Sequence, residues 1–273
     1  MTAAQRRTSA PSSVEGNSRP KARNGRASGH AQARQVEPTS DRIPGPLPGH
    51  RPDLLLFSRE FFEPSAAWVA PRLLGHWLLF CTPTGWSGGI IVETEAYLAH
   101  DPACHGYKRQ TARNRTMYGP PGHAYVYFIY GNHWCFNAVC GPPGVAEAVL
   151  VRAIEPAVGL PWMQKRRAVA DARELTNGPA KCCAALGIDR THDGIDLCQA
   201  ASPVLLARHP QHDHLMSCLG PLITTTRIGI SQAPDWPLRF YLEGSRFVSK
   251  RAQDAGRAPA RSGARPTKPE AQG

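Results

Sequence analysis

Two glutamates and a tyrosine alternate in the segment Ile91–Tyr97, which reads Ile-Val-Glu-Thr-Glu-Ala-Tyr. Side chains of an extended strand point alternately to opposite faces, so Glu93, Glu95 and Tyr97 should share one face. A carboxylate there could act as a general base or stabilise developing positive charge. The spacing does not choose between the two acids, and for any such strand the commoner interpretation is the solvated face of a half-buried sheet.

Histidines, cations and aromatic residues follow this segment closely. Such a set suits the handling of a nucleobase, because aromatic rings stack on an electron-poor base and cations bind phosphate. Tyr97, His105 and Tyr127 are the candidates for a base-binding pocket. The residues concerned are His100, His105, Lys108, Arg109, Arg113, Arg115 and the run Tyr125–Tyr130.

Tyr130 is followed at once by Gly131, so the preceding strand should end near Ile129 and leave the Tyr130 ring projecting from a turn. A projecting ring could fill the gap that a flipped nucleotide leaves in a duplex. We therefore expect Tyr130 to intercalate.

Two further basic residues have candidate roles. Arg152 lies between Val151 and Ala153 in an apolar strand and needs a partner if it is buried, so a structural ion pair is the simplest interpretation. Lys181 follows Asn-Gly-Pro-Ala at the start of a predicted helix, where backbone N–H groups and the amine could hold a phosphate.

The formal net charge of +11 suggests a polyanionic partner, but it lies mostly in the ends of the chain. Nine basic and three acidic residues in 1–51, and six and two in 250–273, leave 17 − 16 = +1 for 52–249. Both ends lack the apolar content for a core. We predict disordered basic tails at 1–52 and 251–273 around one domain at 53–250.

The eight cysteines show neither Cys-x-x-Cys nor a Cys/His ligand spacing, so we expect reduced thiols, no metal and no cofactor. No stretch resembles a membrane span or a secretory signal. The chain is expected to be intracellular, cytoplasmic or nucleoid-associated if bacterial, without membrane contact and monomeric.

Strand patterns dominate the first half of the domain and helices come later, which favours a mixed α/β fold with a curved antiparallel sheet and packed helices. Helices are predicted at Pro64–Leu74, Leu160–Ala172 and Pro179–Leu186. Strands are predicted at Trp77–Cys81, Gly89–Tyr97, Ala124–Tyr130, Trp134–Val139, Ala148–Ile154, Arg227–Ile230 and Leu238–Leu242.

The segment Phe61–Ser249 resembles the alkyladenine (3-methyladenine) DNA glycosylases of the mammalian alkyladenine type. The resemblance rests on seven stretches in the same order: ETEAY (93–97), RQTxRNR (109–115), YVYFIYG (125–131), CFN (135–137), LVRAIEP (150–156), NGPAK (177–181), and RIGIS with PLRFYLEGSRFVS near the end.

This resemblance implies a monofunctional base-excision repair enzyme of one α/β domain, which flips alkylated purines out of double-stranded DNA and needs no metal. By resemblance, the catalytic carboxylate that activates water falls on Glu95, and the supporting arginine on Arg152. The base-stacking residues fall on Tyr97, His105 and Tyr127, the pocket asparagine on Asn137, and the intercalating residue on Tyr130.

Two other classes of function stay open at this stage. In a non-catalytic DNA-binding module, Glu95 would be an ordinary surface carboxylate. In a hydrolase of free nucleosides, Glu93 and Glu95 could act as a carboxylate pair, since residues two apart on a strand lie about 7 Å apart at Cα.

Overall fold

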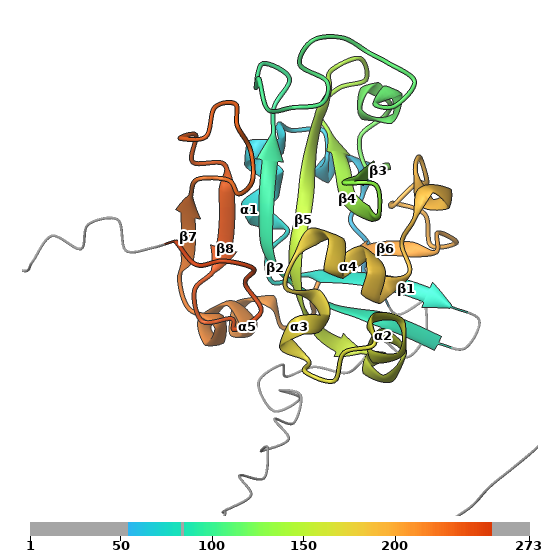
Figure 1. Cartoon of the computed structure of the whole chain (residues 1–273), viewed down its shortest axis with the longest axis vertical. Coiled ribbons are helices and arrows are strands. Elements are labelled where there is room, and N and C mark those ends of the chain that lie inside the picture. The colour runs from blue at the N-terminus through green and yellow to red at the C-terminus, as the bar shows by residue number, and fades with distance from the viewer. Residues whose placement is uncertain (1–53, 83–84, 253–273) are drawn as a thin grey trace, which may run out of the picture. The chain divides into compact units, whose positions relative to one another are not determined.

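The computed structural model describes residues 54–82 and 85–252 (Figure 1). The predicted disordered tails, 1–52 and 251–273, lie outside these residues apart from Arg251 and Ala252.

Eight strands in the described part of the chain form one curled antiparallel sheet. Their order is β3-β4-β5-β2-β1-β6, and β8 pairs with the C-terminal part of β2 and carries β7 on its other side. The strands are β1 (Trp77–Thr82), β2 (Gly85–Tyr97), β3 (Ala124–Ile129), β4 (His133–Cys140), β5 (Glu147–Val158), β6 (Val204–Ala207), β7 (Leu222–Thr225) and β8 (Arg239–Leu242).

Strand β2 is the long central strand of the sheet and pairs with β1 first and β8 later along one edge. It runs beside β5 on the other edge, with register shifts at Gly88/Gly89 and around Glu93. Glycine is required at the first shift, because a Cβ on Gly89 would lie 2.0 Å from the carbonyl oxygen of Glu155. Such irregularities bend a strand, which here lets the sheet curl around a site at the end of β2.

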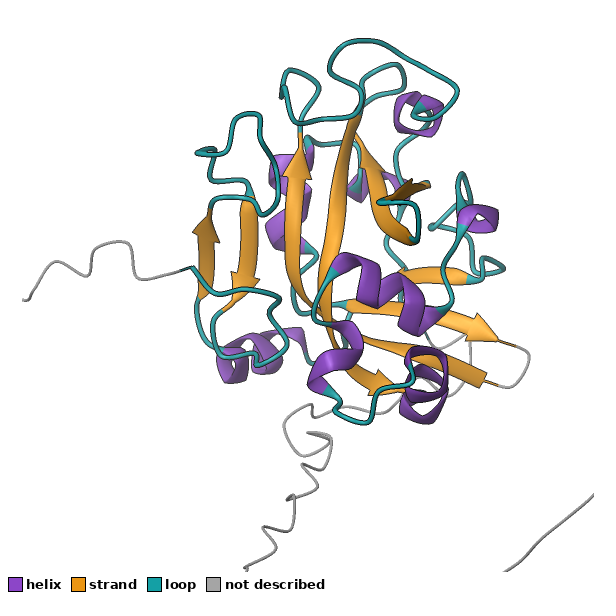
Figure 2. Cartoon of the chain, viewed as in Figure 1, coloured by secondary structure: helices purple, strands orange, loops and turns teal. Residues whose placement is uncertain are grey.

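Helices cover both faces of this sheet (Figure 2). Helix α1 packs on β2 and β5, and α4 packs on β4 and β5, with α2 and α3 against α4. The helices are α1 (Ala66–Arg72), α2 (Leu160–Arg167), α3 (Arg173–Thr176), α4 (Pro179–Leu186) and α5 (His212–Leu219), with short 3₁₀ turns η2 (Arg59–Phe61), η3 (Arg115–Tyr118) and η4 (Arg190–His192).

Helix α1 has a cap built from two segments. The Ser65 side chain accepts a bond from Ala67 N–H, while Glu147 accepts from the Ser65 hydroxyl and the Ala66 N–H. These bonds satisfy donors that a helix start leaves unpaired. Pro71 is tolerated because it lies near the end of this short helix. The helix is also tied to the sheet, since the Thr94 hydroxyl of β2 donates to the carbonyl of Ala70 at 2.9 Å.

One predicted helix is too long, and one predicted strand is wrong. The helix predicted at Leu160–Ala172 ends at Arg167, because Ala168 takes a left-handed backbone conformation with φ 52°, and α3 begins at Arg173. The strand predicted at Arg227–Ile230 is a loop. Its backbone turns at Gly229, where φ is 74°, and the strand lies just before it in β7.

The predicted fold class is confirmed, since helices pack on a curled antiparallel sheet in a single domain. The core lies between the sheet and the helices and holds fully buried residues such as Phe62, Leu74, Ile90 and Phe136. None of the helices in the described ranges is long and apolar enough to cross a membrane. No disulfide joins any of the eight cysteines, all of which lie in described segments.

Candidate active site

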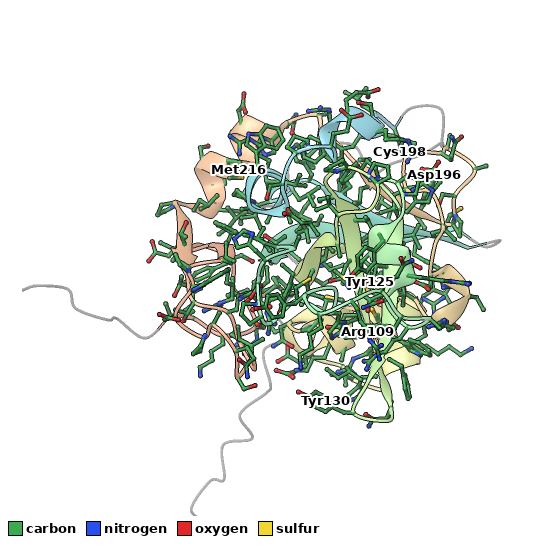
Figure 3. All side chains as sticks on the ribbon, turned by 90° about the horizontal axis from the view of Figure 1, so that it is seen from above. Arg109, Tyr125, Tyr130, Asp196, Cys198 and Met216 are labelled. Carbon is green, nitrogen blue, oxygen red and sulfur yellow. The ribbon has the colours of Figure 1, made fainter. Side chains whose placement is uncertain are left out.

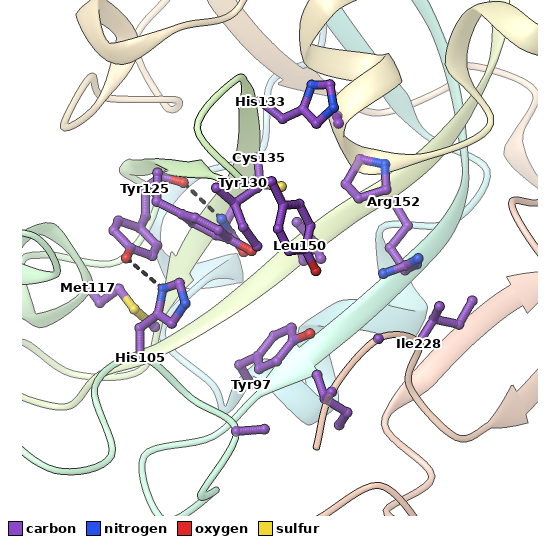
Figure 4. A pocket seen from close by; sticks show the side chains of 18 residues that line it. Tyr97, His105, Met117, Tyr125, Tyr130, His133, Cys135, Leu150, Arg152 and Ile228 are labelled. Atoms are coloured by element: carbon purple, nitrogen blue, oxygen red, sulfur yellow. Dashed lines mark hydrogen bonds between the residues drawn. The ribbon is translucent and has the colours of Figure 1, made fainter. Parts of the chain in front are cut away.

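A pocket of about 350 Å³ opens where the ends of β2 and β5 meet the β3–β4 hairpin and the start of α4 (Figure 4). Its polar and aromatic lining includes six side chains at which the sequence analysis placed roles. These are Tyr97, His105, Tyr127, Tyr130, Asn137 and Arg152. The fold thus brings together residues from four strands and two loops.

Glu95 lies behind one wall of this pocket and is fully buried. Its Oε2 accepts from the Tyr97 hydroxyl at 2.8 Å and lies 3.1 Å from Nη1 of Arg152. Its Oε1 accepts from the backbone N–H of Ile228 at 2.8 Å. All three partners line the pocket, so the groups that bind the carboxylate also form part of the cavity wall.

Glu93 is equally buried, but Arg239 and Ser249, which hold it, do not line the pocket. Nη1 of Arg239 donates to its Oε1 at 2.8 Å, and the Ser249 hydroxyl donates to the same oxygen at 2.9 Å. The Ser249 N–H donates to Oε2 at 2.7 Å. Glu93 and Arg239 therefore form a structural ion pair.

The burial of both carboxylates corrects the expectation of a solvated strand face. The side chains alternate as predicted, since Glu93 and Glu95 both approach Arg152 while Thr94 faces α1. The face that carries Glu93 and Glu95 does not contact water, however, because the loop at 226–238 and the segment at Ser249 cover it. Alternation shows which residues share a face but not what covers that face.

Arg152 connects the two carboxylates and is 7% exposed. Its Nε lies 3.4 Å from Oε1 of Glu93, and its Nη1 contacts Glu95. Burial alone would lower the pKa of Arg152, but Glu95 and then Glu93 raise it, so the guanidinium stays charged. The expected ion pair is present and also borders the pocket.

Aromatic rings form the wall opposite Ile228 in the close view of the pocket (Figure 4). The rings of His105 and Tyr127 meet edge to face at 4.5 Å, and Nδ1 of His105 lies 2.9 Å from the Tyr125 hydroxyl. Burial, with the Arg113 charge, lowers the pKa of His105. Burial also raises the pKa of Tyr127, and burial together with Glu95 raises that of Tyr97, so these rings remain uncharged near neutral pH.

Asn137 and Cys135 contribute from β4 and are both buried. The Asn137 amide donates to the backbone carbonyl of Tyr125 at 3.0 Å, which fixes its orientation at the pocket wall. Burial raises the pKa of the Cys135 thiol, which is therefore neutral. Asn137 therefore offers an oriented amide at the pocket wall, and Cys135 adds no charge there.

Tyr130 stands at the tip of the β3–β4 hairpin, as predicted, with β3 ending at Ile129. Tyr130 and Gly131 have φ values of 54° and 75°, which suits the right-handed twist of a tight hairpin. The ring is 80% exposed, and Figure 3 shows it projecting from the edge of the molecule on the same side as Arg109.

The predicted phosphate-binding cations differ in their surroundings. Arg109 and Arg115 are exposed. Nζ of Lys181 instead lies 2.6 Å from Oε2 of Glu174 and 2.8 Å from Oδ1 of Asn177. Lys181 is therefore already paired, whereas the two arginines are open to solvent.

The sequence analysis missed the loop that closes over Glu95. It supplies the Ile228 N–H and a buried ion pair between Arg227 and Asp101. Arg239, the partner of Glu93, was also missed. An arginine within the apolar stretch at 227–230 could have signalled a buried partner, but the partner lies 126 residues away in sequence.

No group of three or more histidine, cysteine or acidic side chains in the described ranges could hold a metal ion. The arrangement instead offers a buried carboxylate, a guanidinium beside it and an aromatic cavity. That combination can stabilise a cationic or electron-poor ligand and polarise a water molecule.

Comparison with known proteins agrees with this chemistry. Residues 60–246 match the family described as Methylpurine-DNA glycosylase (MPG). Similar proteins named "Putative 3-methyladenine DNA glycosylase" occur in Rhodopseudomonas palustris (48% identity, covering 78% of this chain and 98% of that protein), Methanoculleus marisnigri (49%, 70% and 97%) and Carboxydothermus hydrogenoformans (43%, 72% and 100%).

The chain belongs to the methylpurine-DNA glycosylase family. The predicted family is thereby confirmed and the chain is a DNA repair glycosylase, while the narrower mammalian alkyladenine type stays a prediction.

Proposed function

We propose that this chain flips alkylated purines of the 3-methyladenine type out of duplex DNA and hydrolyses their N-glycosidic bond, with Glu95 activating the water. The observation that carries the proposal is the Glu95 carboxylate, buried behind an aromatic pocket and held by three donors that themselves line that pocket.

Water activation at Glu95 follows from the acceptor sites of its carboxylate. An ionised carboxylate has about four lone-pair sites, and the three observed donors leave one for a water molecule. Glu95 takes a proton from that water while the oxygen bonds to C1′ of the sugar. The C1′–N bond breaks and its electrons leave with the base.

The buried charge also stabilises the oxocarbenium-like sugar, because electrostatic attraction is strong where water is excluded. A 3-methyladenine carries a positive charge in DNA and leaves as a neutral base, so the reaction needs no proton donor. Arg152 holds the carboxylate in place. With water as the nucleophile, the enzyme is monofunctional.

Base recognition is assigned to the rings around the cavity. Tyr97, His105 and Tyr127 are uncharged and can stack on a base, and stacking favours an electron-poor alkylated ring. Asn137 supplies an oriented amide at the pocket wall. A cavity of about 350 Å³ accommodates a single nucleobase with its sugar at the mouth.

Flipping and duplex contact are assigned to the exposed groups at the rim. Tyr130 enters the base stack and occupies the space of the departed nucleotide. Arg109 and Arg115 contact phosphates. Lys181 contributes less than they do, because Glu174 neutralises its charge.

The test is release of 3-methyladenine from methylated duplex DNA by the purified chain. We expect the free base and an intact strand with an abasic site, and far slower turnover of free alkylated nucleosides. The Glu95→Gln protein, purified in parallel, controls for contaminating glycosylase. Faster turnover of nucleosides than of duplex would support the nucleoside hydrolase, and no release by either protein would support a binding module.

A further inference from the structure

The buried ion pair of Arg227 and Asp101 lies directly beside the groups that hold Glu95. Both side chains are fully enclosed, and the guanidinium donates to both carboxylate oxygens of Asp101. The same Nη1 donates to the backbone carbonyl of Ala96, the neighbour of Glu95, at 3.0 Å. One side chain therefore joins the loop at 227 to two points about 130 residues earlier, Ala96 near the end of β2 and Asp101 just beyond it.

The position of Arg227 determines where two hydrogen-bond donors lie. The next residue along the chain, Ile228, directs its N–H at Oε1 of Glu95. The Arg227 guanidinium also lies 4.7 Å from the centre of the Tyr97 ring, whose hydroxyl donates to Oε2. Arg227 thus supports a donor to each oxygen of the carboxylate without touching the carboxylate itself.

The loop at 226–238 is fastened at both ends as well. Nε of Arg239 donates to the carbonyl of Thr226 at 2.8 Å, and the Ala96 N–H donates to the carbonyl of Leu238 at 2.8 Å. Between these points Ile228, Gly229 and Ile230 line the pocket. A fixed loop is needed here, because small displacements of a catalytic group cost large factors in rate.

We infer that the Arg227–Asp101 pair is a positioning device for the reaction: it holds the Ile228 N–H and the Tyr97 ring so that the Glu95 carboxylate keeps one orientation toward the pocket. This inference rests on the proposed role of Glu95. It predicts that losing the pair slows base release while leaving binding of the damaged duplex intact.

The experiment measures single-turnover base release and the dissociation constant for a duplex with one lesion. Arg227→Met combined with Asp101→Asn removes both charges, so neither is left buried alone. Arg227→Lys keeps the charge but loses the bidentate contact with the two carboxylate oxygens of Asp101. Arg59→Met, which breaks the partly exposed Arg59–Asp196 pair elsewhere, controls for the loss of an arginine ion pair as such.

We expect the double variant to release base about 10²-fold more slowly and Arg227→Lys about tenfold more slowly, as for a displaced catalytic group. The dissociation constant should change less than about threefold. Hydrogen exchange should show that the Ile228 N–H loses protection while the core amides of β2 keep theirs. Arg59→Met should match the wild type in rate.

Wild-type rates in a folded double variant, equal losses of rate and binding, or a slow variant whose Ile228 N–H stays protected would each overturn the inference. If the double variant does not fold, Arg227→Lys decides by the same criteria. A Glu95→Gln protein as fast as the wild type would instead overturn the proposed function, so the two failures are distinguishable.

Discussion

The two ends of one buried charge network differ in what encloses them. At the Glu93 end, Arg239 and Ser249 hold the carboxylate, and neither residue lines the pocket. At the Glu95 end, every partner of the carboxylate also faces the pocket. Arg152 connects the two ends.

This difference separates two roles that the sequence pattern alone makes equivalent. Both glutamates lie on one strand face, two residues apart, and both are fully buried. The partners that hold Glu93, Arg239 and Ser249, do not line the pocket, so we assign that carboxylate to stability. The partners of Glu95 do line the pocket, so we assign the chemistry to Glu95.

The largest effect is expected on stability at the closed end. Glu93→Gln leaves Arg239 buried without a carboxylate, which should lower the free energy of unfolding by about 3 kcal/mol. Glu95→Gln should lower it less, because water from the pocket can reach Arg152. Urea denaturation of both variants measures this, and a larger loss for Glu95→Gln would reverse our assignment.

Measuring the free energy of unfolding against pH sharpens the comparison, because a buried polar cluster outside the glutamate network should dominate the pH dependence. Burial, with nearby His212 and Arg208, lowers the pKa of His76 to about 3, and burial with His212 lowers that of His209 to about 4. The backbone N–H of His209 also donates to Nδ1 of His76 at 3.0 Å.

The folded state therefore favours neutral histidines, and their stabilisation is complete above about pH 6.5 and is lost as pH falls toward 4. We expect about 1–2 kcal/mol of lost stability per histidine between pH 6.5 and pH 5. His76→Gln should flatten that slope. A slope unchanged in this variant would show that His76 does not cause the pH dependence.

The exposed hairpin tip should affect flipping and leave the network untouched. Tyr130→Ala removes a stacking ring, so flipping measured by 2-aminopurine fluorescence should weaken about tenfold, with less loss of nonspecific binding. Its stability should match the wild type, since the ring is 80% exposed. Equal losses in flipping and in salt-matched nonspecific binding would contradict intercalation.

The smallest effect separates two cations at the rim. Arg109→Ala should weaken duplex binding about threefold. It should also reduce the slope of log affinity against log salt concentration by about one, as for the loss of one phosphate contact. Lys181→Ala should change both less, because Nζ is paired with Glu174. Fluorescence anisotropy across a salt series measures this, and a stronger effect for Lys181→Ala would show that DNA displaces Glu174.

Local sequence patterns predicted most strands of the sheet and the strand positions of the candidate site residues. The alternation around Glu95, the strand end at Ile129 and the helix at Pro179–Leu186 agree with the structure. Each depends on neighbouring residues alone. Short elements such as β6 and α5 were missed because four to eight residues carry too little periodicity.

The environment of the site could not be predicted in the same way. Glu95 is buried because a loop more than 130 residues later places Ile228 over it. That loop was predicted as a strand from its apolar side chains, whereas its backbone turns at Gly229 and offers an N–H to the carboxylate. Long-range contacts of this kind depend on topology rather than on local periodicity.

The most direct test of the two-role account is the single-turnover rate of base release from a one-lesion duplex at saturating protein, measured for Glu95→Gln and Glu93→Gln side by side. General-base loss predicts a rate about 10³-fold below wild type for Glu95→Gln and a rate within about tenfold of wild type for folded Glu93→Gln. Equal rates for the two variants, or a slower Glu93→Gln, would contradict the assignment of the chemistry to Glu95.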